Sequence, residues 1–84
     1  MNQIRIVLAD DHTVIRSGLK LLLERQPDLI VAGEAENGRE AVEAADRLRP
    51  AVMVLDIAMP MLNGIEATRQ IVAAHPSISV VILS

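Results

Sequence analysis

Four polar side chains stand directly after short apolar runs, where strand ends could bring them together. They are Asp10 and Asp11 after residues 4–9, Asp56 after residues 52–55 and Ser84 after residues 79–83. Three carboxylates held close together disfavour ionisation unless a cation neutralises them. Their hard oxygen atoms suit Mg²⁺, which prefers one or two carboxylates with waters and a phosphate oxygen. A carboxylate beside such an ion could attack phosphorus and form an aspartyl phosphate, and the Ser84 hydroxyl could donate to a phosphoryl oxygen.

The same residues also have purely structural interpretations. Asp10 or Asp11 could cap the helix that follows, which is a common use of aspartate worth about 1 kcal/mol. Asp56 could be an ordinary loop residue, and Ser84 could be no more than the last residue of its strand. The pattern alone leaves the metal site and the structural interpretations open.

The elements that must position these side chains alternate along the chain. Short apolar runs predict strands at 4–9, 29–35, 52–55 and 79–83. Apolar positions at helical spacing predict helices at 13–26, from the end of the Asn37-Gly38 turn to about 49, and at 65–75. Pro27, Pro50 and Pro76 end the helices. This order, βαβαβαβ, predicts an α/β fold with a parallel sheet, because parallel neighbours need crossover connections. Ligands bind such sheets at the carboxyl ends of the strands, where the acids lie.

The composition of the chain disfavours several classes of protein and of binding site. The chain has 84 residues, 51% hydrophobic, with no aromatic residue, no cysteine and a net charge of -3. These values predict one folded domain, and they weigh against disulfide scaffolds, zinc–thiolate sites and a basic nucleic-acid footprint. Neither a signal peptide nor an apolar run of membrane-spanning length is present, so we expect a cytoplasmic protein. His12 is expected to be an exposed loop residue, not a ligand.

Five stretches of the sequence resemble one family. They are IRIVLADDH, the SGL of the first predicted helix, GEAENGREAVE, VLDIAMPMLNG and VVILS, and they cover essentially the whole chain. Together they resemble the receiver domain of bacterial two-component response regulators, in the NarL/FixJ subgroup with a LuxR-type helix-turn-helix output. The resemblance implies a flavodoxin-like fold with strand order 2-1-3-4.

The resemblance also implies roles for individual residues. Asp56 matches the phosphoacceptor, phosphorylated by a sensor histidine kinase, and Ser84 matches the switch hydroxyl. Asp10 and Asp11 match the acidic pair that holds Mg²⁺, with the backbone carbonyl of Ala58 completing the protein's ligands. The family is a signalling domain rather than an enzyme, and phosphorylation would regulate DNA binding by an output domain of the parent protein.

The chain departs from the family pattern after Ser84. Receivers continue into a fourth helix, a fifth strand that ends in a catalytic lysine, and a fifth helix, so residues 1–84 resemble a receiver fragment. We therefore expect Mg²⁺ binding, impaired phosphotransfer, and self-association through the exposed strand 79–83. One alternative is an inactive, self-associating fragment. The other is a Mg²⁺-dependent phosphatase with an aspartyl nucleophile, although that class typically has a second acid where Ala58 stands.

Overall fold

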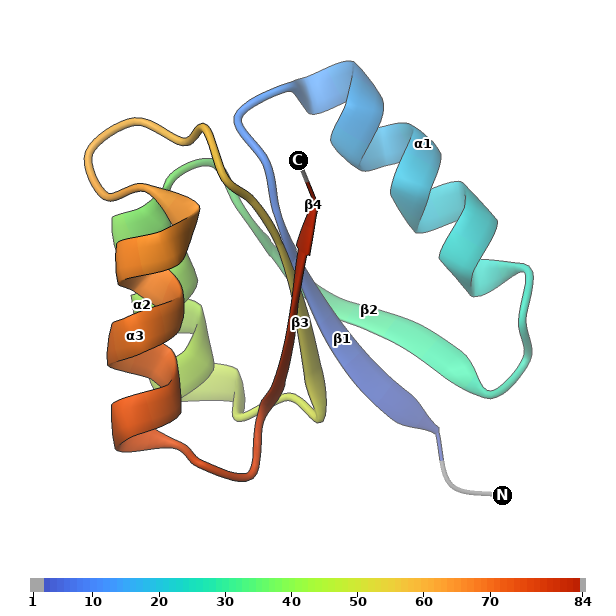
Figure 1. Cartoon of the computed structure of the whole chain (residues 1–84). Helices are drawn as coiled ribbons and strands as arrows, with labels where there is room; N and C mark the ends of the chain where they lie inside the picture. Colours follow the sequence, from blue (N-terminus) through green and yellow to red (C-terminus); the bar gives the residue numbers. More distant parts are fainter. Residues whose placement is uncertain (1–2, 84) are drawn as a thin grey trace.

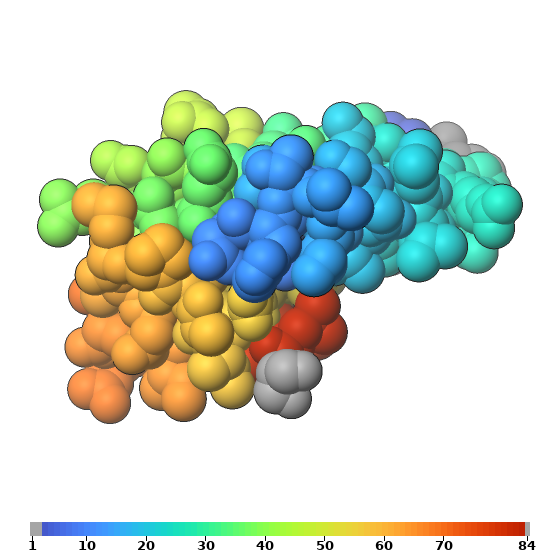
Figure 2. Space-filling view, turned by 90° about the horizontal axis from the view of Figure 1, so that it is seen from above, coloured from blue at the N-terminus to red at the C-terminus, as the bar shows by residue number. Residues whose placement is uncertain are grey.

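Four parallel strands form one sheet. The computed structural model describes residues 3–83, and in them the strand order is β2-β1-β3-β4. The strands are β1 (Ile4–Ala9), β2 (Leu29–Ala35), β3 (Val52–Asp56) and β4 (Ser79–Leu83). This is the order that the resemblance implied, so the 2-1-3-4 prediction is confirmed. All carboxyl ends lie along one edge of the sheet, which Figure 2 views from above.

Three helices cover the sheet unequally. They are α1 (Thr13–Glu24), α2 (Gly38–Leu48) and α3 (Gly64–Ala74), with α2 and α3 side by side on one face and α1 on the other (Figure 1). The Asn37 side chain accepts from the Glu40 amide at 2.8 Å, and the Asn63 side chain accepts from the Glu66 amide at 2.9 Å. These N-caps fix the start of α2 and α3. The first helix ends at Glu24, two residues before the predicted end.

The tightly packed core lies between the sheet and the α2–α3 layer. Val7, Met53 and Leu55 are fully buried there against alanines of the two helices, including Ala41 and Ala67. The small alanine side chains let these helices approach the strands closely. Burial of each large side chain stabilises the fold by about 1.5–3 kcal/mol.

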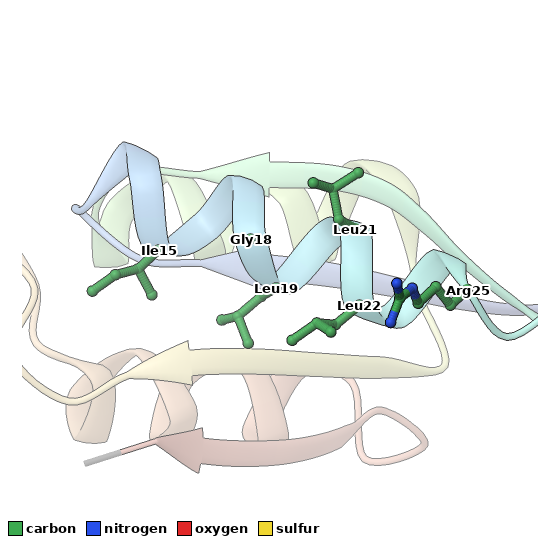
Figure 3. Close-up of a pocket in the computed structure, with 6 residues that line it drawn as sticks. All are labelled: Ile15, Gly18, Leu19, Leu21, Leu22 and Arg25. Atoms are coloured by element: carbon green, nitrogen blue, oxygen red, sulfur yellow. The ribbon is translucent and has the colours of Figure 1, made fainter.

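The opposite face is only partly covered. None of the residues of α1 is buried, although its apolar positions recur at helical spacing. Figure 3 shows Ile15, Leu19 and Leu22 pointing toward the side of the sheet where β3 and β4 lie. With Gly18, Leu21 and Arg25 they line an apolar groove along the helix. In the described residues β4 is an edge strand, and Val81 remains 47% exposed.

Two glycines allow close approaches that a side chain would prevent. A Cβ atom at Gly38 would lie 1.7 Å from the Leu62 carbonyl oxygen, and one at Gly64 would lie 2.4 Å from the carbonyl oxygen of Asp56. The first contact joins the start of α2 to the loop before α3, and the second packs the start of α3 on the end of β3. The lack of a side chain at both positions therefore lets the loop that follows Asp56 pack closely against its neighbours.

Gly38→Ala should lower the free energy of unfolding by about 1–3 kcal/mol, because the added methyl group forces the loop at Leu62 outward. Gly18→Ala is the matched control, since nothing lies within 4 Å of a Cβ there. In the middle of α1 this change should raise stability by about 0.5–1 kcal/mol. Urea unfolding followed by far-UV circular dichroism measures both, and equal effects of the two variants would contradict the packing argument.

Candidate functional site

The acidic residues at the ends of β1 and β3 come together in space. Ala9 pairs with Leu55 in the sheet, so Asp10 and Asp56 leave neighbouring strands at the same level. One ligand atom from each of Asp10, Asp11, His12 and Asp56 lies within 4.8 Å of the others. Figure 2 shows the segment after β1, in blue, beside the yellow-orange segment after β3. The predicted convergence of the three carboxylates is therefore present in the structure.

Asp10 is the most tightly held of the three acids. It is only 7% exposed, and its Oδ1 accepts from the backbone amide of His12 at 2.7 Å and lies 2.9 Å from His12 Nδ1. The backbone amide of Asp10 donates to the Ala35 carbonyl at 3.0 Å. These contacts orient the carboxylate toward the other acids before any ligand binds.

The helix-capping alternative is not what the structure shows. The N-cap of α1 is His12, and no side chain makes a capping hydrogen bond there. Asp10 accepts from the amide of His12 itself, and Asp11 is exposed beside it. Neither acid therefore acts as the N-cap of this helix, and both carboxylates take part in the cluster.

Arg16 supports the site from the first turns of α1. Its Nη1 donates to the backbone carbonyl of Asp10 at 2.5 Å, and its Nε donates to Glu34 Oε1 at 2.8 Å. Lys20 Nζ lies 3.8 Å from the other oxygen of Glu34. The guanidinium thus ties α1, β2 and the end of β1 together. Sequence reasoning missed this pair, although a glutamate within the apolar run 29–35 was a signal for a buried or bridging partner.

Backbone contacts fix Asp56 and the loop after it. Asp56 is half-buried, and its Oδ1 accepts from the Ala58 amide at 3.4 Å. The Ile57 amide donates to the Leu83 carbonyl at 3.1 Å, and the Gly64 amide donates to the Ile57 carbonyl at 2.9 Å. The proposed use of the Ala58 carbonyl as a ligand stays a prediction. Ser84 lies outside the described residues, so its place beside Asp56 is also left as a prediction.

The acids of the cluster raise the pKa of His12. A hydrogen bond with Asp10 raises the pKa of His12 above its ordinary value of 6.5, and the negative charge of Asp11 raises it further. Its Nδ1 lies 3.0 Å from Asp11 Oδ1. The imidazole is exposed, so the acids act on it through solvent-screened contacts.

The donor set fits a hard divalent ion. Three carboxylates at one sheet edge carry more negative charge than Arg16, the cation bound to the Asp10 carbonyl, can neutralise. Carboxylate and carbonyl oxygens are the ligands Mg²⁺ uses in proteins, and it keeps several waters where protein ligands are few. The exposed position of Asp11 and half-buried position of Asp56 leave room for those waters and for a phosphoryl oxygen.

Comparison with known proteins decides the family. Residues 6–84 match the family model of the response regulator receiver domain. The chain belongs to this family. It is 41% identical over 83 residues to the transcriptional regulatory protein DegU of Brevibacillus brevis, covering 99% of this chain and 35% of that protein. It is 50% identical over 68 residues to LiaR of Bacillus subtilis, covering 81% of this chain and 32% of that protein.

Solved receiver structures agree with this assignment. The response regulator domain of Thermotoga maritima CheB superposes with a TM-score of 0.89 at 41% identity, covering 96% of this chain and 60% of that one. A LuxR-family response regulator from Aurantimonas sp. SI85-9A1 gives 0.91 at 36% identity, covering 96% and 58%. These relatives confirm the resemblance to LuxR-type regulators. The receiver chain spans about a third of the length of the curated relatives it matches.

No helix among residues 3–83 is long and apolar enough to cross a membrane. The cytoplasmic location stays a prediction of the sequence.

The histidine titration can be measured directly, because the chain has only two histidines. We expect a His12 pKa above 6.5 in the metal-free protein, and a lower one in Asp10→Asn and in Asp11→Asn. Because the pKa of His12 is raised in the folded state, its contact with the acids stabilises the fold fully below pH 6.5. This stabilisation is lost as the pH rises through the pKa of His12 in the folded protein. Proton NMR of the imidazole signals against pH measures it. A His12 pKa at or below 6.5 in the unaltered chain would contradict the contact.

Proposed function

We propose that this receiver accepts a phosphoryl group on Asp56 from a sensor histidine kinase, in a Mg²⁺-dependent reaction. The observation that carries the proposal is the convergence of Asp10, Asp11 and Asp56 within 4.8 Å at the carboxyl ends of β1 and β3. In a chain of the receiver family, such a cluster would provide both the nucleophile and the cation site that phosphotransfer needs. Residues 1–84 are one receiver unit in this proposal.

Each residue of the cluster has a distinct task. A carboxylate oxygen of Asp56 attacks phosphorus in line with the phosphohistidine nitrogen, a P–O bond forms, and the P–N bond breaks. Its electron pair remains on the imidazole of the kinase, which takes up a proton. Asp10, Asp11, Asp56 and the carbonyl of Ala58 would hold the Mg²⁺ ion. When bound, the ion supplies positive charge to the phosphoryl oxygens and screens the acids from one another.

The rest of the chain prepares this arrangement. Arg16 holds the carbonyl of Asp10, and the contact between Gly64 and Asp56 keeps the end of β3 in place. Ser84 would donate its hydroxyl to the phosphoryl group and so report phosphorylation to neighbouring elements. Preorganisation of this kind lowers the cost of bringing charged groups together in the reaction.

We extend the proposal to a longer protein with a DNA-binding output. DegU and LiaR are named as transcriptional regulatory proteins, and this chain covers about a third of each. A structure of RcsB, 27% identical, is described as bound to a promoter in the presence of phosphomimetic BeF3-. By analogy, phosphorylation of Asp56 would regulate DNA binding in the parent protein.

The phosphatase alternative is not favoured by the site. Hydrolysis of a phosphoester through an aspartyl nucleophile uses a general acid to protonate the leaving group. The position that supplies this acid in that class is Ala58 here. The metal-site cluster contains no carboxylate beyond Asp10, Asp11 and Asp56 among residues 3–83.

Incubation with a small phosphodonor and Mg²⁺ should add the mass of one phosphoryl group to the chain, and Asp56→Asn should abolish the adduct. Asp28→Asn is the matched control, because Asp28 lies at the amino end of β2, at the opposite edge of the sheet. Intact-mass spectrometry measures the adduct. An adduct that persists in Asp56→Asn refutes the assignment, and a folded chain that never gains one supports the inactive fragment.

We also propose that the 84-residue chain associates with a second copy through β4. Among residues 3–83, β4 pairs with β3 alone, and Val81, Ile82 and Leu83 are 47%, 38% and 39% exposed. An apolar edge strand offers unpaired backbone groups to an identical edge, so pairing of two copies extends the sheet. The apolar groove along α1 opens toward the side of the sheet where β3 and β4 lie. It adds apolar surface that contact between two copies can bury.

Val81→Lys should shift the 84-residue chain toward monomer, because a charge on an edge strand opposes pairing with an identical strand. Val14→Lys is the control, since Val14 is 85% exposed on α1. Sedimentation velocity over a dilution series measures both variants and the unaltered chain. Monomeric behaviour of the unaltered chain at every concentration would refute self-association without touching the proposal for Asp56.

A further inference from the structure

The imidazole of His12 lies across the acidic pair. Its Nδ1 is 2.9 Å from Asp10 Oδ1 and 3.0 Å from Asp11 Oδ1. The same cluster includes a carboxylate oxygen of Asp56, and all of these ligand atoms lie within 4.8 Å of one another. A nitrogen donor thus faces the place where three oxygen donors converge.

The spacing of these atoms is that of neighbouring ligands on one ion. Ligand atoms at 2.0–2.1 Å from an octahedral ion are about 3 Å apart along an edge of the octahedron. The two distances from His12 Nδ1 have this length. Both oxygens therefore lie at the distance from His12 Nδ1 that binding to one shared ion requires.

The backbone holds His12 in this position. It is the N-cap residue of α1, with φ -100 and ψ 105, and its carbonyl accepts from the Arg16 amide at 2.9 Å. Its amide donates to Asp10 Oδ1 at 2.7 Å. These two hydrogen bonds, one with the Asp10 side chain and one with the first turn of α1, fix the position of the His12 Cα atom.

We propose that His12 Nδ1 is a further metal ligand of this site, and that the site therefore also takes imidazole-binding divalent ions such as Ni²⁺, Co²⁺ and Zn²⁺. The inference rests on the proposed function, because it assigns a fourth side chain to the same cation site. Imidazole nitrogen favours these ions, whereas Mg²⁺ favours oxygen ligands and water. His12 thus sets which cation the receiver prefers. In the ligated form Nδ1 gives its lone pair to the ion and the ring proton is on Nε2.

The composition of the chain makes this assignment testable. It contains two histidines and no cysteine, so His75 is the one other side chain that offers an imidazole nitrogen. His75 lies at the end of α3, where its Nε2 is 2.7 Å from Asp46 Oδ1. His75→Gln is therefore a matched control for His12→Gln, which replaces imidazole by a neutral polar group.

Isothermal titration calorimetry of the 84-residue chain with Ni²⁺ and with Mg²⁺ tests the proposal. We expect His12→Gln to weaken Ni²⁺ binding by at least about tenfold, the lower limit for loss of a group that supports a metal. Mg²⁺ affinity should change by less than about threefold, because oxygen ligands and water dominate its binding. His75→Gln should leave both affinities unchanged, and circular dichroism shows whether each variant is folded.

A second readout does not depend on affinity. With ¹⁵N-labelled chain, Zn²⁺ should shift the Nδ1 resonance of His12 as expected for a ligated nitrogen, while the His75 resonances stay in place. Equal Ni²⁺ affinity in His12→Gln and the unaltered chain overturns the proposal. Tighter binding of both ions in His12→Gln also overturns it, because the imidazole would then compete with the cation.

The two proposals can fail separately. Mg²⁺-dependent phosphorylation of Asp56 with unchanged Ni²⁺ affinity in His12→Gln removes only the role of His12. If the folded chain binds neither ion and gains no phosphoryl group, the proposed function fails together with the ligand assignment.

Discussion

Parallel pairing of β1 with β3 is the constraint on which the site depends. It brings Asp10, Asp11 and Asp56 to one edge of the sheet, where their like charges oppose one another. The sheet register sets this proximity, and buried contacts on both strands maintain it. Val7 and Met53 are fully buried next to each other in the register, so the strands cannot move apart without opening the core.

The surrounding contacts resist the repulsion at the strand ends. Asp10 is held by the amide of His12 and, through its carbonyl, by Arg16. The end of β3 is held by Gly64, whose lack of a side chain allows contact with the Asp56 carbonyl. Local backbone geometry and one guanidinium therefore keep in place a cluster that a cation would stabilise further. A bound cation would relieve this repulsion, and a phosphoryl group on Asp56 would add negative charge that the cation offsets.

The two faces of the sheet differ in a way that bears on partners. The buried alanines of α2 and the buried Ala67 and Ile71 of α3 pack tightly on the strands, and the core of the protein lies there. On the other face α1 has no buried residue, and its apolar side chains line a groove that opens toward the side of the sheet where β3 and β4 lie. The acidic cluster lies at the carboxyl ends of β1 and β3, and β4 contacts it through the hydrogen bond from the Ile57 amide to the Leu83 carbonyl.

Much of the fold could be predicted because local pattern and topology agree. Short β-branched runs, helix-ending prolines and crossover connections sufficed to predict the strand and helix order, and family resemblance supplied the strand order. The predicted helix 13–26 was two residues longer than α1, which ends at Glu24. Pro27 marks where a helix cannot continue, but a helix can end before such a residue. Asp10, Asp11 and Asp56 could be predicted as neighbours for the same reason, because parallel strands end at one edge.

The sequence by itself determined which residues stand at the strand ends and that three of them are carboxylates. Only the tertiary structure decided what faces them. The role of Arg16 depends on a contact with Glu34, eighteen residues away in the sequence and across from α1 on β2. The position of His12 between two carboxylates depends on the bend between β1 and α1, which periodicity does not describe. The partners of a side chain depend on how separate helices and strands pack together. The pattern of residues along the chain predicts those helices and strands but does not predict the contacts between them.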